Sequence, residues 1–252
     1  MPLGSFITDL TYGPIVTGRA QGAEDTGLSD GPRGIMPCVG APFMAPNHVG
    51  ARFIAPAVRR AVAIVNQGQV GFCGVDLTEA PCVPPDSPWV SRRSMLRPGD
   101  VVLPRSGEGS LGKHRVAVFL ADQPAGVGSF VDLIRLQGLN PFYLAAFLKS
   151  TLGRSQVSRA ANGVGVPNIS FDEIRRLLVP ALPQQAQQAI EARYRREVLP
   201  LHRQAVKRHA SLRAQRDDPR TDRELRELRK AGERQWGEVI GELDARLLVP
   251  NA

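Results

Sequence analysis

The sequence contains no long apolar run. None of its segments approaches the roughly 18 consecutive apolar residues that a membrane-spanning helix needs, which excludes a transmembrane protein. The first ten residues also lack the basic stretch, apolar core and small-residue cleavage site of a secretory signal, so we expect a cytoplasmic protein. Apolar residues nevertheless make up 42% of the 252 residues and charged residues only 22%, a balance that predicts one or two globular units.

Cysteine is scarce as well. The three cysteines, Cys38, Cys73 and Cys82, are odd in number, are never spaced Cys-x-x-Cys and have no histidine cluster beside them. Disulfide frameworks and zinc sites need paired or clustered ligands. The sequence therefore predicts neither disulfides nor a metal site, and it indicates no cofactor.

Signatures of catalysis are missing too. There is no Gly-x-Ser-x-Gly elbow, no His-Glu-x-x-His run, and no lysine preceded two positions earlier by an acidic residue, as magnesium nucleases require. The string Gly107–Lys113 has the spacing of a phosphate-binding loop, but His114 stands where a magnesium-binding hydroxyl is needed, and β-branched residues follow. Residues 140–143 (Asn-Pro-Phe-Tyr) resemble the Asn-Pro-Pro-aromatic tetrapeptide of DNA amino-methyltransferases without its second proline. We therefore expect no enzymatic activity of the chain's own.

The composition changes near residues 180–183. Before this point lie almost all of the glycines and prolines, and short β-rich runs that predict strands over 61–65, 69–75, 100–104, 114–120 and 129–136. Asn140 followed by Pro141 predicts a helix over 142–150, and Ser170 with Glu173 forms a capping box for a helix over 171–177. Residues 1–182 therefore predict an α+β domain.

After Pro183 the pattern becomes helical. Apolar residues spaced by threes and fours predict two amphipathic helices, separated by a polar turn at 216–220, so a helical hairpin is the simplest arrangement for residues 183–252. Pro200 lies inside the first helix and should kink or split it near Val198. Thr221 with Glu224 offers a capping box for the second helix.

Positive charge exceeds negative charge by 8, from 32 Lys plus Arg and 24 Asp plus Glu, which weakly favours a polyanionic partner. The excess is concentrated between residues 92 and 115, a turn-rich segment with six cations and two acids. Glycines let a backbone approach a duplex while flanking cations meet phosphates or guanine edges, so we expect this segment to present one DNA-binding face. The predicted contacts are Arg92, Arg93, Arg105, Ser106, Lys113, His114 and Arg115.

A second polar segment covers residues 159–168. It holds Arg159, Asn162 and Asn168, and arginine and asparagine are the side chains best shaped for guanine and adenine edges. We predict Arg159 and Asn162 as further DNA contacts. Asparagine also favours turns beside glycine and proline, so a structural role is an equally simple interpretation.

Four short motifs follow one another in a fixed order. Residues 96–113 contain Gly-Asp before an apolar run, then a glycine loop and Gly-Lys; residues 140–150 form a Tyr-Leu helix that ends in Lys-Ser. Residues 162–170 run from Asn-Gly to Asn-Ile-Ser, and residues 178–185 contain a Pro-x-x-Pro-Gln exit into a long helix. Together they cover about residues 90–205. Their order resembles that of the target recognition domain in specificity (S) subunits of type I restriction-modification systems.

This resemblance implies that residues 1–182 are a DNA target recognition domain and that residues 183–252 are a helical spacer. In such systems the partners are double-stranded DNA, a DNA methyltransferase subunit and, in some complexes, a restriction or translocase subunit. A full family member usually carries two recognition domains, whereas this chain has room for one, so the resemblance implies a self-dimer or a second specificity chain. The residues we expect at the partner surface are Ile190, Tyr194, Leu201, Leu225, Trp236 and Leu243.

Two other functions stay open. The chain could be an accessory recognition module of a stand-alone DNA methyltransferase, or a helical scaffold that binds only protein and never contacts DNA. The extra helix after Pro219 departs from the plainest pattern of the family, because it could pack back on the first helix.

Overall fold

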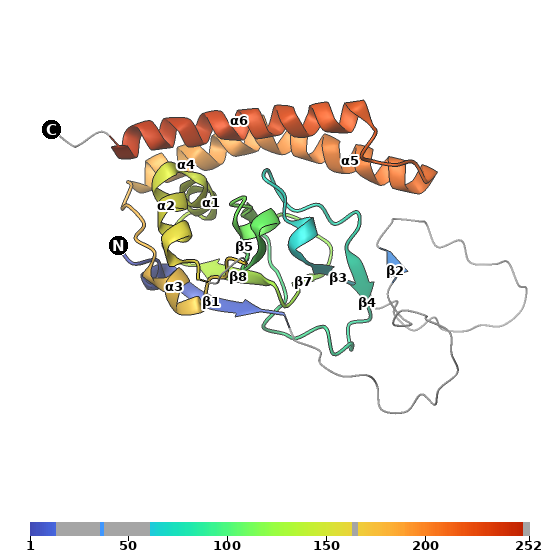
Figure 1. The fold of residues 1–252 in the computed structure, drawn as a ribbon, viewed down its shortest axis with the longest axis horizontal. Helices are drawn as coiled ribbons and strands as arrows, with labels where there is room; N and C mark the ends of the chain where they lie inside the picture. Colours follow the sequence, from blue (N-terminus) through green and yellow to red (C-terminus); the bar gives the residue numbers. More distant parts are fainter. Residues whose placement is uncertain (14–35, 38–60, 163–165, 249–252) are drawn as a thin grey trace, which may run out of the picture.

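The computed structural model describes residues 1–13, 36–37, 61–162 and 166–248, which form an α+β fold as the sequence predicts (Figure 1). The hairpin of α5 (Leu199–Gln215) and α6 (Arg223–Leu248) runs along one side of the β-rich part, and β1 (Ile7–Tyr12) lies on the opposite side (Figure 1). Within these ranges, no helix is long and apolar enough to cross a membrane.

The β-strands form two four-stranded sheets. The first has the order β1-β8-β5-β6 and is antiparallel throughout; the second has the order β2-β4-β3-β7, in which β3 and β7 are parallel. The strands are β1 (Ile7–Tyr12), β2 (Met36–Pro37), β3 (Val62–Val65), β4 (Pro81–Val83), β5 (Val101–Pro104), β6 (Ala117–Val118), β7 (Ala125–Val127) and β8 (Val131–Leu136).

The central part of the first sheet, in β5 and the first four residues of β8, is buried on both faces. Side chains alternate along a strand, and accordingly Val101 and Ile134 pack in the main core, whereas Val102 and Leu133 pack in a second core with residues of the other sheet. A sheet covered on both sides needs apolar residues at successive positions. This explains why β5 is a continuous apolar run, whereas in β8 the residues Asp132 and Arg135 interrupt the apolar pattern.

Three short helices cover the main core beside this sheet. They are α1 (Pro141–Lys149), α2 (Thr151–Ala160) and α3 (Phe171–Arg176). The side chain of Asn140 accepts hydrogen bonds from the amides at 142 and 143, at 2.9 and 3.3 Å, and the capping box of Ser170 and Glu173 is present. Both predicted helix starts are therefore confirmed. The sequence analysis missed α2, whose N-cap is Ser150.

The C-terminal part is a helical hairpin, as predicted. It consists of α4 (Gln184–Arg193), a π-helical turn (Tyr194–Val198), α5 (Leu199–Gln215) and α6 (Arg223–Leu248). Pro200 lies in the first turn of α5, directly after the π turn, so the predicted break near Val198 is confirmed. The predicted Thr221 cap is wrong: Asp222 accepts the hydrogen bond from the Leu225 amide at 2.7 Å, while the Thr221 hydroxyl donates to the Asp218 carbonyl.

Aromatic rings join the hairpin to the rest of the chain. The ring centre of Tyr194 lies 4.8 Å from that of Phe142 on α1 and 5.0 Å from that of Trp236 on α6. The main core therefore contains residues from both predicted domains, which makes the hairpin an integral part of the fold.

This packing corrects the predicted partner surface. Five of its residues are buried within the chain, and the sixth, Leu201, is half-buried near Gly232 on α6. Their helical periodicity marks the face of each helix that packs inward, because an amphipathic helix buries its apolar stripe against whatever covers it. The five are Ile190, Tyr194, Leu225, Trp236 and Leu243.

Three further expectations need correction. The predicted strand over 69–75 is a turn in which the Gly71 amide donates to the Gly74 carbonyl at 2.9 Å, and the strand over 114–120 shortens to β6. Cys82 is disulfide-bonded, whereas Cys73 is free and Cys38 lies outside the described residues. The disulfide was not foreseen because the spacing of three cysteines does not indicate which of them the fold brings together.

Candidate nucleic-acid interface

Five of the nine predicted DNA contacts line two separate hollows. We call the first the Arg105 pocket; it has a volume of about 1040 Å³ and is lined by Trp89, Arg105, Ser106, Ser129, Phe130, Asn162, Val166, Asn168, Ser170 and Glu173. We call the second the hairpin cleft; it has a volume of about 800 Å³ and lies between the 68–79 loop, Lys113, Arg115 and the α5–α6 hairpin. The cations of residues 92–115 therefore do not share one hollow.

Arg105 is fixed from several directions. It follows β5, where its amide donates to the Phe130 carbonyl at 3.0 Å and its carbonyl accepts from the Ile169 amide at 3.0 Å. Its guanidinium carbon lies 4.4 Å from the ring centre of Tyr12 and 5.1 Å from that of Phe171. Stacking on aromatic faces holds a planar guanidinium in one orientation. Arg105 is thus a rigid cation, with only 18% of its side chain exposed.

Asp132 on β8 lies behind the guanidinium. Its Oδ1 is 3.6 Å from the Arg105 Nε, its side chain is fully buried, and neither this Nε nor either carboxylate oxygen has a hydrogen-bond partner among the described residues. Burial raises the pKa of Asp132 to about 7, although the nearby Arg105 charge acts in the opposite direction. The carboxyl group therefore holds a proton more readily than an ordinary aspartate.

The other walls of the Arg105 pocket combine exposed rings with amides. Phe130 is 60% exposed and Trp89 is 39% exposed. Asn162 donates from its side chain to the Ala160 carbonyl at 3.1 Å and to Glu173, whereas the side chain of Asn168 makes no hydrogen bond within the described part of the chain. The amide that is free to bind a ligand is therefore that of Asn168. The amide nitrogen of Asn162 is bonded within the protein, in line with the structural interpretation of this residue.

Most of the remaining predicted contacts lie outside this pocket. Arg92 and Arg93 are exposed in a turn that follows Trp89, and Arg159 is exposed in the last turn of α2. Ser106 does line the pocket, and its backbone carbonyl accepts from the Gln67 side chain at 2.9 Å.

His114 faces into the protein. Its φ is 49°, its Nδ1 is buried without a hydrogen bond among the described residues, and burial lowers its pKa, with help from the charges of Arg154 and Lys149. His114 is half-buried, and its lowered pKa disfavours the charged form that would attract a phosphate.

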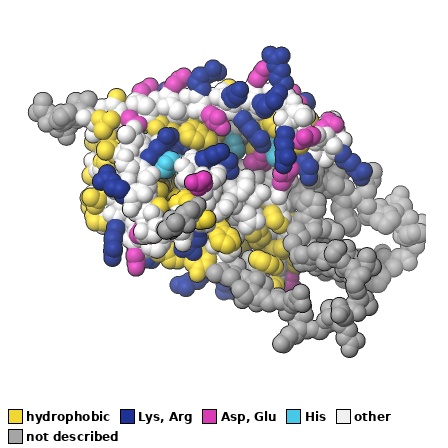
Figure 2. All heavy atoms as spheres, in the orientation of Figure 1, with side chains coloured by type: hydrophobic (Ala, Val, Ile, Leu, Met, Phe, Trp, Pro, Cys, Tyr) yellow, Lys and Arg dark blue, Asp and Glu magenta, His cyan; other side chains and the backbone are white. Residues whose placement is uncertain are grey.

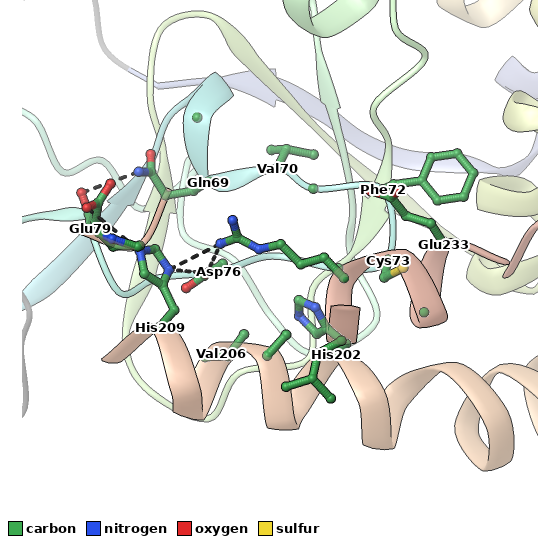
Figure 3. A pocket seen from close by; sticks show the side chains of 18 of the residues that line it. Gln69, Val70, Phe72, Cys73, Asp76, Glu79, His202, Val206, His209 and Glu233 are labelled. Carbon is green, nitrogen blue, oxygen red and sulfur yellow. Dashed lines mark hydrogen bonds and ion pairs between the residues drawn. The ribbon is translucent and has the colours of Figure 1, made fainter. Parts of the chain in front are cut away.

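Lys113 and Arg115 line the hairpin cleft and form no ion pair among the described residues, whereas Asp76, Glu79 and His209 on its other walls are paired (Figure 3). His209 on α5 is buried with its Nδ1 2.7 Å from Asp76 on the loop, and Arg213 lies 3.1 Å from Glu79. Burial alone would raise the pKa of Asp76, but hydrogen bonds from Thr78 and His209 outweigh it and lower that pKa. The cleft therefore fastens the hairpin to the 68–79 loop.

Charges of both signs cover the outer face of the hairpin. In the view of Figure 2, lysine and arginine side chains alternate with acidic ones along these helices. Arg193 on α4 pairs with Glu242 on α6, for example, and also with Glu197 at 3.1 Å. This face is mixed in charge, unlike the footprint of a DNA backbone.

Known proteins resemble the chain in structure only. No family model and no curated protein matches its sequence. The S subunit of a type I restriction-modification system from M. genitalium is 13% identical with a TM-score of 0.46, and the similarity covers 81% of this chain and 41% of that one. The HsdS subunit from Thermoanaerobacter tengcongensis is 16% identical with a TM-score of 0.36, covering 73% and 38%. The type IIG restriction endonuclease BpuSI is 14% identical with a TM-score of 0.33, covering 62% and 18%.

The chain spans less than half the length of each of these S subunits.

Proposed function

We propose that this chain is a non-catalytic DNA specificity subunit that reads a short duplex target. The observation that carries the proposal is the Arg105 pocket, where a stacked guanidinium, the free amide of Asn168 and two exposed aromatic rings meet in one hollow. Arginine and asparagine read base edges in the major groove, and apolar groups contact the thymine methyl. The pocket therefore has the chemistry of base reading more than that of phosphate binding alone.

The same proposal assigns a task to each part of the chain. Residues 1–182 bind the DNA target. Residues 183–252 bind a DNA adenine methyltransferase and, in a complete system, a restriction or translocase subunit, and so bring these partners to the target. Because the apolar stripes of the hairpin are buried inside the chain, these partners would bind its charged outer face. A second recognition half would come from another copy of this chain or from a second specificity chain.

Selection from a duplex library with a randomised centre tests the reading of DNA. The purified full-length chain should enrich one short motif, and its affinity should fall linearly with the logarithm of salt concentration. Failure to retain any duplex at low salt, with binding to a protein partner intact, would instead support the scaffold that contacts no DNA.

Recruitment needs a separate experiment in cells. Deleting the chain should abolish methylation at every site that carries the selected motif, because the methyltransferase would have no reader. Methylation that persists with a relaxed sequence preference would indicate the accessory module of a stand-alone methyltransferase. An unchanged methylation pattern would reject recruitment altogether.

A further inference from the structure

The Arg105 pocket contains one cation whose binding direction is fixed. The Nε of Arg105 is buried against Asp132, while its two terminal nitrogens make no hydrogen bond within the described ranges. Only these terminal nitrogens can bind a ligand, since the rest of the head group is held by Tyr12, Phe171 and the carboxylate. The side chain therefore presents a pair of parallel N–H donors.

We propose that Arg105 reads a guanine in the DNA target, a role that rests on the proposed function. Guanine offers two acceptors in the major groove, O6 and N7, at a spacing that the two donors of a guanidinium match. Adenine offers one acceptor and one donor at the same edge, so it would leave one N–H of Arg105 unpaired. Cytosine offers only a donor there.

A phosphate is the alternative ligand for an arginine, and the surroundings argue against it. Glu173 lines the same pocket and the carboxyl group of Asp132 lies behind the guanidinium, whereas Arg105 is the only lysine or arginine among the lining residues that the structure describes. Phosphate sites gather several cations or backbone amides around the anion. Two exposed rings and a free amide fit bases better than they fit a phosphate.

The rigidity of Arg105 strengthens this assignment. An arginine on the surface loses side-chain freedom when it binds, which costs affinity without adding selectivity. Here the two rings and the backbone hydrogen bonds on both sides of the residue have already fixed it in the free protein. Most of its binding energy is thus available to distinguish one base from another.

The first test compares Arg105→Ala with the wild type in the duplex selection. The wild-type motif should contain a guanine for which R105A loses its preference, roughly 5- to 150-fold, while the other positions keep theirs. Arg175→Ala is the matched control, because Arg175 also lies over the Phe171 ring, at 5.9 Å, but does not line the pocket. R175A should enrich the wild-type motif.

The second test changes the DNA, so the loss expected for the wild type does not depend on how a variant folds. Replacing that guanine by 7-deazaguanine removes the N7 acceptor and should weaken wild-type binding at least several-fold, with no further loss for R105A. If the wild type enriches no motif, the proposed function fails and the role of Arg105 with it. If a motif appears but R105A keeps every position, or weakens all sequences alike, only the role of Arg105 is rejected.

Discussion

Asp132 and Arg105 lie side by side with 3.6 Å between Oδ1 and Nε, yet the described structure gives neither of these atoms a hydrogen bond. A buried acid in this position is costly when ionised, and it also holds a proton at a pH where other aspartates have lost theirs. The pair therefore links the stability of the fold to the group that we propose reads DNA.

Replacing Asp132 by asparagine should remove part of the pH dependence of stability. The pKa of Asp132 is raised from 3.8 to about 7, so the folded chain keeps a proton that the unfolded chain releases. The stability this gives is complete below pH 4 and is lost as the pH rises through 7. Between pH 5 and pH 8 the wild type should lose about 2 to 3 kcal/mol relative to D132N. Urea unfolding of the wild type and D132N at pH 5 and pH 8 measures this difference. If the free energy of unfolding changed equally in both proteins between the two pH values, the prediction would be contradicted.

Arg135→Ala should destabilise the fold at the start of β5. Arg135 donates to both carboxylate oxygens of Asp100, at 2.8 and 2.6 Å, and Asp100 is only 3% exposed. Removing one partner of such a pair leaves an uncompensated buried charge, which costs about 3 kcal/mol or more. The control is R175A, which breaks an exposed pair with Asp172 and should cost less than about 1 kcal/mol. Denaturant unfolding midpoints compare the stability of R135A and R175A. Equal losses of stability in the two variants would show that the buried pair matters no more than the exposed one.

Trp236→Ala should loosen the hairpin from the rest of the fold. Trp236 is 2% exposed and touches the Tyr194 ring that in turn packs on Phe142. Truncating a buried aromatic residue costs about 3 to 5 kcal/mol. The chain offers a matched control in its other tryptophan, Trp89, which is 39% exposed and should tolerate alanine with a loss of no more than about 1 kcal/mol. Calorimetry gives both values; similar losses would show that Trp236 does not join the two parts.

Local features of this fold were predictable from sequence, and contacts between distant segments were not. The helix start at Asn140 and the break at Pro200 depend on neighbouring residues, so the sequence carries them directly. The stacking of Arg105 over the rings of Tyr12 and Phe171 depends on how three distant segments meet. One feature of the sequence could have indicated the Arg105 pocket. Asp132 interrupts an apolar strand, and an acid in a buried strand often marks a functional position.

The prediction of a partner surface on the hairpin was wrong for a different reason. The periodic apolar residues of the hairpin predicted a face that packs, and the structure confirms that it packs. Periodicity does not say whether the covering surface belongs to the same chain. Trp236 and Leu243 are therefore covered by the chain's own main core.

Lys149→Met should stabilise the protein at neutral pH, with a pH dependence opposite in sign to that of Asp132. Lys149 is 1% exposed, donates to the Val116 carbonyl and lies 5.2 Å from the ring centre of Phe72. Burial lowers its pKa from 10.5 to about 7, although nearby Cys73 acts to raise it. The folded chain therefore releases a proton that the unfolded chain keeps, so wild-type stability should rise between pH 7 and pH 9 by about 2 kcal/mol.

K149M carries no charge at any pH, so it should lack this rise and should exceed the wild type in stability most clearly at pH 7 or below. Lys230→Met on the exposed face of α6 is the control, and it should leave the difference between pH 7 and pH 9 as in the wild type. Denaturant unfolding at both pH values decides the matter. A wild type whose stability does not rise relative to K149M would mean that Lys149 stays charged in the folded protein, with the ring of Phe72 and the Val116 carbonyl compensating for its burial.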